Sequence, residues 1–173
     1  MFKIFFLFFV SFFLDGIIPQ LINSFAGSAV FLLPFFTVTF LIYLAVILNK
    51  EPYELLILSF IFGLFYDVAY TNVLFLNSFI FIIISVLLLL FYRQIKTNVL
   101  INIIVTILTI LIYISLNYLV FQILGVASFS LENIFYIFIR SIPINITYIS
   151  LLTLLLKNRN QKVSFSNYLR FYS

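Results

Sequence analysis

Long apolar runs separated by short charged connections dominate this chain. In one of them, residues 79–84, six apolar residues follow one another without a break. Hydrophobic residues make up 65% of the 173 residues and charged residues only 8%, whereas a soluble domain carries about 25% charged residues. Because so few charges cannot cover an aqueous surface, we predict an integral membrane protein. The runs do not alternate apolar and polar residues as barrel strands do, so the spans are predicted to be helices.

The length of the chain allows about six such spans, because a membrane-spanning helix needs about 20 apolar residues. The predicted spans cover residues 4–22, 25–48, 52–66, 73–92, 99–124 and 132–156. The third is the shortest, since 15 residues reach only about 22 Å where the hydrocarbon core measures about 30 Å. The fold class is therefore an all-α membrane protein, a compact bundle of six transmembrane helices in residues 1–156 with a basic cytoplasmic tail in residues 157–173.

The first span contains three residues that are unusual inside a membrane helix, namely Asp15, Gly16 and Pro19. They predict a polar break near its outer end. Lys3 and the apolar run after it resemble a signal peptide, but the interruptions favour a span that is retained.

The positions of the basic residues predict the orientation of the bundle. With six crossings and a cytoplasmic N-terminus, eight of the nine lysines and arginines face the cytoplasm, and only Arg140 lies within a span. If the third segment instead entered the membrane and returned to the same side, six of these basic residues would lie on one side of the membrane and two on the other. The positive-inside rule favours the first arrangement, with both termini cytoplasmic. It also explains the net charge of +4 without a nucleic-acid partner.

The chain contains neither histidine nor cysteine. It therefore lacks the commonest general base, the commonest metal ligand and any thiolate chemistry. No phosphate-binding glycine loop and no nucleophile–base pair is visible either. These observations predict a protein that is not an enzyme and uses no cofactor or metal.

Two charged residues at membrane depth stand out. Asp67 follows the short third helix, and it is either a fixed hydrogen-bond anchor or a loop aspartate in water. Arg140 lies in the outer half of the sixth span, and it either extends to the interface or forms an ion pair with Asp67 or Asp15. We favour the ion pair, because intramembrane charges usually face the bundle interior and pair. Pro143 and Asn145 predict an irregular helix just beyond Arg140.

A motif at the end of the third span resembles a known family. Gly63, Leu64 and Asp67 form a Gly-Leu-x-x-Asp element, and after a short loop Leu74 opens the fourth span. This pattern is similar to that of the MreD family of rod shape-determining membrane proteins, in which a Leu-Gly pair opens the fourth helix. Phe75 stands where that glycine is expected. The length and the number of spans also agree with the family.

The resemblance implies where partners are recognised. The segment from Arg140 to Asn145, with Pro143, is similar to the last helix of the family, and Asn77 follows the Leu74 position. The structural or partner-recognition candidates are Asp15, Gly63, Leu64, Asp67, Leu74, Asn77, Arg140 and Pro143.

The resemblance also implies a function. It suggests a multi-pass scaffold in the bacterial cytoplasmic membrane, embedded in membrane lipids, that acts in cell elongation and peptidoglycan synthesis. The expected direct partner is MreC, together with MreB filaments and a RodA-type polymerase with its transpeptidase. The bundle is also expected to resemble the substrate-binding S component of energy-coupling-factor vitamin transporters. Such a component is the alternative function, with a pocket lined by Asp67, Arg140 and tyrosines. The absence of an Ala-x-x-x-Ala pattern in residues 4–14 speaks against it.

Overall fold

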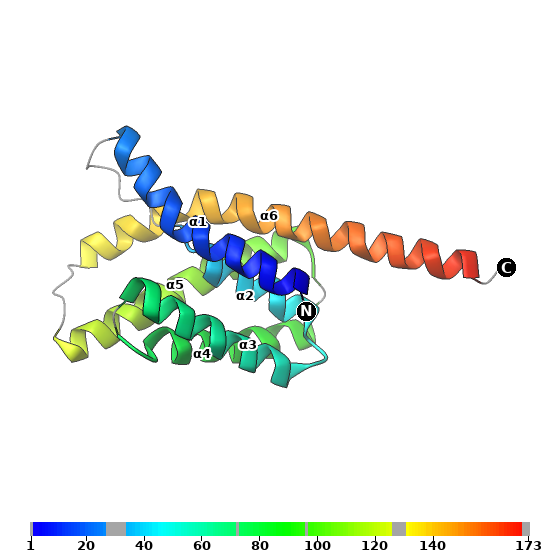
Figure 1. Ribbon diagram of the computed structural model, residues 1–173, viewed down its shortest axis with the longest axis horizontal. Coiled ribbons are helices and arrows are strands. Elements are labelled where there is room, and N and C mark those ends of the chain that lie inside the picture. The colour runs from blue at the N-terminus through cyan, green and yellow to red at the C-terminus, as the bar shows by residue number, and fades with distance from the viewer. Residues whose placement is uncertain (1, 27–33, 72, 96, 126–130, 171–173) are drawn as a thin grey trace.

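All regular elements in the described part of the chain are helices. The computed structural model describes residues 2–26, 34–71, 73–95, 97–125 and 131–170. The elements are α1 (Phe2–Ala26), α2 (Phe36–Ile47), α3 (Pro52–Tyr66), a π-helical turn η1 (Asp67–Thr71), α4 (Leu76–Gln94), α5 (Val99–Leu124) and α6 (Leu131–Arg170). Five of the helical segments are long and apolar enough to cross a membrane, with η1 counted as the continuation of α3. The protein is thus an all-helical bundle of the predicted class (Figure 1).

The short helix α2 forms the centre of the bundle. It has 12 residues, ten of which are buried, and it contacts each of the other five α-helices. At a rise of 1.5 Å per residue α2 is only about 18 Å long, which is shorter than the hydrocarbon core of about 30 Å. The residues of its first turn are buried, so α2 begins inside the protein. The second span was predicted to start at Phe25, but Phe25 and Ala26 belong to α1. Residues 27–33 lie outside the described residues.

Both ends of the chain lie at the same end of the bundle (Figure 1). The α2–α3 connection, which carries Lys50, and the α4–α5 connection, which follows Arg93, lie there too. The η1–α4 connection and the start of α6 lie at the opposite end. Basic residues therefore gather at one end of the bundle, as the positive-inside pattern requires.

Aromatic rings attach α1 to the rest of the bundle. Phe8 is fully buried and lies flat on Phe62 of α3, with 3.6 Å between ring centroids and 5° between planes. Phe5 meets the same ring edge-on at 5.8 Å. The phenylalanine-rich composition of α1 therefore contributes directly to packing.

The helices are more continuous than the sequence suggests, and the predicted break in the first helix was wrong. Asp15, Gly16 and Pro19 do not break the first helix, which runs on to Ala26. Pro143 does not interrupt α6. Membrane helices tolerate such residues because neighbouring groups satisfy the freed backbone. Asp67 lies in helical backbone instead of a loop, because α3 continues as η1 and the combined segment has 20 residues, Pro52–Thr71.

The sixth helix is also longer than predicted. Its backbone continues past residue 156 to Arg170, and Figure 1 shows this part extending beyond the bundle. No break in the backbone therefore separates residues 1–156 from the basic tail. The side chains of residues 156–173 lie outside the described part of the structure.

Candidate functional site

Asp67 binds the start of the next helix, α4. Its side chain is fully buried. Oδ1 accepts hydrogen bonds from the backbone N and from Nδ2 of Asn77, at 2.8 and 2.9 Å. Oδ2 accepts from the backbone N and Oγ of Ser78, at 3.3 and 3.2 Å. Thr71 adds a fifth donor through its hydroxyl, at 3.1 Å from Oδ1.

This geometry makes Asp67 an N-cap supplied by a different helix. The first N–H groups of a helix have no partner within it, and a side-chain oxygen on the N-cap residue usually accepts from the second or third helical residue. The N-cap position of α4 is Phe75, which has no such oxygen and makes no side-chain cap. Asp67 takes its place, and its negative charge also suits the positive end of the α4 dipole.

Gly63 provides the space for this cap. A Cβ atom at Gly63 would lie 2.3 Å from Ser78 Cα and 2.6 Å from Ser78 N. These are backbone atoms of the same turn that Asp67 caps. Residues four apart lie on one face of a helix, so the glycine lets α3 approach α4 closely and the aspartate uses that approach. The Gly-Leu-x-x-Asp spacing thus has a direct geometric explanation.

Asn77 extends the contact to a third helix. Its Nδ2 donates to Asp67, while its Oδ1 accepts a 2.8 Å hydrogen bond from the hydroxyl of Tyr113 on α5. Asn77 and Tyr113 are both buried. The contacts around Asp67, which we call the Asp67 cap, therefore join α3, α4 and α5.

Asp15 repeats the arrangement at the central helix. Its Oδ1 accepts from Phe36 N at 2.7 Å and its Oδ2 from Thr37 N at 2.9 Å. Both N–H groups belong to the first turn of α2, whose own N-cap residue, Phe35, makes no side-chain cap. Asn145 of α6 accepts from Phe35 N at 3.2 Å through Oδ1. We call this set of contacts the Asp15 cap.

Both caps satisfy backbone groups that could not remain unpaired in this setting. An unsatisfied N–H group costs several kcal/mol in the hydrocarbon region, where no water can bind it. Each aspartate binds two successive N–H groups from a separate helix. Asp67 is thus a hydrogen-bond anchor in this structure, the first of the two alternatives that the sequence left open.

Arg140 lies on α6 with its guanidinium carbon 3.8 Å from the ring centroid of Tyr136. Such a cation–π contact suits an arginine at membrane depth. The ion pair that we favoured from the sequence is not among the described contacts of Asp15 or Asp67, which are with backbone, amide and hydroxyl groups.

The remaining sequence candidates differ in how far they are exposed. Leu64 is half-buried on α3, and Pro143 is exposed on α6. Leu74, in the η1–α4 connection, is 63% exposed. The structure therefore brings Gly63, Asp67 and Asn77 together and leaves the other candidates apart from them.

Asn145 and Tyr70 also contribute to these contacts, although neither is among the candidates from the sequence. Asn145 was considered only as a sign of irregularity, yet it caps Phe35 N and also accepts from the hydroxyl of Thr39 at 3.0 Å. Tyr70 of η1 donates to the carbonyl oxygen of Phe12 in α1 at 2.7 Å. Gly16 leaves room for it, since a Cβ there would lie 2.7 Å from the Tyr70 hydroxyl. For Asn145 the sequence does contain a signal, because an amide side chain inside an apolar span needs a hydrogen-bond partner.

A comparison with known protein families gives a match over most of the chain. A family model described as rod shape-determining protein MreD matches residues 1–162. The chain belongs to the MreD family. It is accordingly a rod shape-determining membrane protein, and its family is a shape-determining, structural one. No curated protein and no solved structure matches the chain.

The departure from the MreD pattern at Phe75 has a visible consequence. Phe75 has a φ of 69°, and it is the one non-glycine residue with positive φ in the described part of the chain. Glycine adopts this left-handed conformation without the steric penalty that a Cβ brings. The Leu-Gly pair of the family pattern therefore suits the backbone turn that leads into α4.

Proposed function

We propose that this protein is a non-enzymatic scaffold of the cell-elongation machinery in the bacterial cytoplasmic membrane, and that it binds MreC directly. MreB filaments and the RodA-type polymerase with its transpeptidase would be reached through this assembly. The family membership supports the process. The gathering of basic residues at the end where both termini lie supports a cytoplasmic position for that end.

The apolar tip of the α3–α4 hairpin is the observation that carries the binding proposal. Val68, Leu74 and Phe75 are 70%, 63% and 48% exposed there. The carboxylate of the same tip, on Asp67, is turned inward and fully buried. A hairpin tip at the edge of a membrane is usually polar, so this reversed arrangement favours a protein contact. MreC, which has a single span and a large outer domain in this family, is the partner we propose for the tip.

In this proposal the two caps are positioning devices. Gly63, Asp67 and Asn77 fix the tip on α5, while Asp15 and Asn145 fix α2 beneath it. None of them needs to touch MreC. The binding residues proper are the outward-facing apolar ones.

Co-purification from the membrane tests the proposal. Affinity-tagged protein is expected to retain MreC, and Leu74→Asn is expected to reduce the retained amount at least five-fold. The matched control is Leu100→Asn, because Leu100 is 68% exposed and lies at the start of α5, at the end of the bundle opposite the tip (Figure 1). Equal retention by both variants would remove the tip as the contact, and no retention by the unaltered protein would refute the scaffold role.

A further inference from the structure

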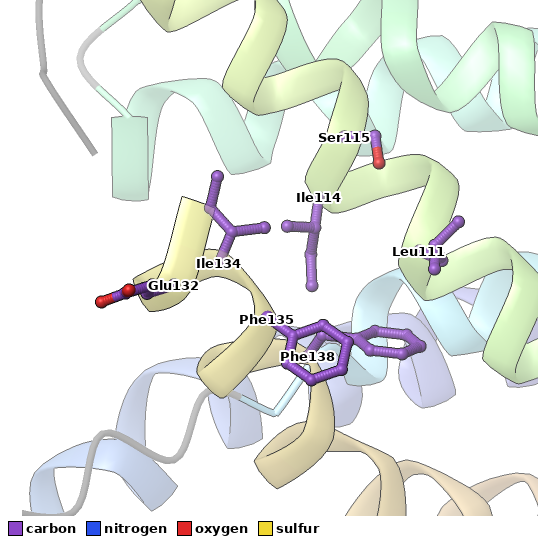
Figure 2. A pocket seen from close by; sticks show the side chains of 7 residues that line it. All are labelled: Leu111, Ile114, Ser115, Glu132, Ile134, Phe135 and Phe138. Atoms are coloured by element: carbon purple, nitrogen blue, oxygen red, sulfur yellow. The ribbon is translucent and has the colours of Figure 1, made fainter. Parts of the chain in front are cut away.

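A cavity of about 480 Å³ lies between α5 and α6. Leu111, Ile114 and Ser115 line it from α5, and Glu132, Ile134, Phe135 and Phe138 line it from α6. Figure 2 shows the isoleucine, leucine and phenylalanine side chains gathered in the cavity, with the Glu132 carboxylate pointing away at one edge. Of the seven described lining residues, five are thus aliphatic or aromatic and one is charged.

The lining of the cavity changes from charged at the membrane face to apolar at depth. Glu132 is the second residue of α6, and Phe138 lies six residues further along the helix, which is about 9 Å. On α5, Leu111 lies 13 residues before the C-terminal residue Leu124, which is about 20 Å of helix. The charged end therefore lies at the membrane face and the apolar end lies at depth, the same polarity as a phospholipid with its head at the surface.

The size of the cavity distinguishes a lipid chain from a helix. An α-helix with its side chains is about 10 Å across, so a 15 Å length occupies about 1,200 Å³. The cavity has less than half of that volume. A hydrocarbon chain is narrow enough to enter, whereas a whole helix is not.

We propose that this cavity, which we call the α5–α6 groove, binds one acyl chain of a phospholipid with an ammonium headgroup, such as phosphatidylethanolamine. Apolar burial gives little selectivity, because the surrounding lipid tails are as apolar as the groove. The selectivity comes from the exposed carboxylate of Glu132, which attracts an ammonium group and repels a headgroup that carries only a phosphate. The site is independent of the hairpin tip.

Native mass spectrometry of the unaltered protein tests the headgroup preference. With phosphatidylethanolamine and phosphatidylglycerol of identical chains in equal amounts, we expect a two- to five-fold excess of bound phosphatidylethanolamine. Glu132→Gln should abolish the excess, while Glu51→Gln should leave it intact, because Glu51 is exposed in the α2–α3 connection at the other end of the bundle. Equal binding of the two lipids by the unaltered protein would overturn the proposal, and so would an excess that survives Glu132→Gln.

A single-tryptophan reporter tests the position of the chain. The protein contains no tryptophan, so Phe135→Trp in the groove and Leu119→Trp on the open face of α5 each give one fluorophore. Phosphatidylethanolamine with brominated chains should quench Phe135→Trp at least twice as strongly as brominated phosphatidylglycerol does, and should show no preference at Leu119→Trp. Equal quenching at the two positions by the two lipids would overturn the proposal. Shielding of Phe135→Trp from both lipids by the single-span partner would also overturn it, since the groove would then be a protein contact.

Discussion

At the residue scale, a few buried polar side chains cap the N-termini of helices to which they do not belong. Asp67 receives five hydrogen bonds and has no exposed surface. Such a residue cannot be removed without leaving buried donors unpaired. We therefore expect the protein to lose stability when Asp67 or Gly63 is replaced by alanine. We expect it to gain stability when Phe75 is replaced by glycine.

Replacing Asp67 tests the cap directly. Asp67→Ala leaves at least two backbone N–H groups buried without partners, at about 1–3 kcal/mol each, so we expect the free energy of unfolding to fall by about 3 kcal/mol. The control is Glu54→Ala in the first turn of α3, where a dipole contact contributes less than about 1 kcal/mol. Unfolding midpoints in detergent measure both. Similar small losses for the two variants would show that Asp67 is no anchor.

The close approach at Gly63 gives the second expectation. Gly63→Ala would place a methyl group 2.3 Å from Ser78 Cα, and backbone on both sides cannot move aside cheaply. Gly16→Ala is the matched control, because the atom nearest its added methyl is the hydroxyl of Tyr70, which can rotate away. We expect Gly63→Ala to lower the unfolding midpoint clearly more than Gly16→Ala. The reverse order would contradict the packing described for the hairpin.

Phe75 gives an expectation of the opposite sign. Its φ of 69° costs a residue with a Cβ about 1–2 kcal/mol, so Phe75→Gly should stabilise the protein by about 1 kcal/mol even though it removes an aromatic side chain. Leu74→Gly serves as the control, since Leu74 does not have a positive φ, and glycine there should destabilise the turn. Thermal unfolding of both variants measures the difference. A loss of stability in Phe75→Gly would mean that its ring contact with Phe60, 6.3 Å between centroids, outweighs the strain.

At the element scale, the start of α2 is held by side chains from two other helices. Asp15 reaches it from α1 and Asn145 from α6. Because α2 contacts all the other helices, its position sets the spacing of the bundle. Asp15 and Asn145 therefore both hold α2 in its position.

This arrangement predicts coupling between Asp15 and Asn145. Asp15→Ala and Asn145→Ala should each destabilise the protein by about 2 kcal/mol through unpaired N–H groups. The double variant should lose less than the sum, with an interaction energy between about 0.5 and 3 kcal/mol. A double-mutant cycle of unfolding free energies measures it. Strict additivity would show that the two residues hold independent parts of α2.

At the scale of the whole molecule, the orientation in the membrane is open to a simple experiment. The chain has no cysteine, so single cysteines are unique labels. Gln94→Cys, at the end of α4, should react with a membrane-impermeant reagent only from the cytoplasmic side. Gln122→Cys, near the end of α5, should react only from outside, since both positions are exposed. Labelling of both from one side would rule out the crossing of α5 and with it the predicted topology.

Much of the architecture could be predicted from the sequence. The bounds of the α3 and α5 helices, Pro52–Tyr66 and Val99–Leu124, agree with the predicted spans. The predicted break at Asp15 failed because its polar side chain is satisfied by α2 and not by water. The short helix was assigned to the third span, whereas in the described residues it is α2.

The sequence by itself determined that this chain lies in a membrane, where most of its spans fall and which end carries the cations. These properties depend on the free energy of transferring side chains from water to lipid. This free energy adds up along the chain, so it can be estimated without knowing any tertiary contact. Only the tertiary structure decided which N–H groups Asp15 and Asp67 bind, that α2 lies at the centre, and that Phe75 has a left-handed backbone. The helices are apolar on nearly every side, so no stripe in the sequence indicates which face meets which neighbour. Those pairings were settled by close packing between helices, at Gly63 above all.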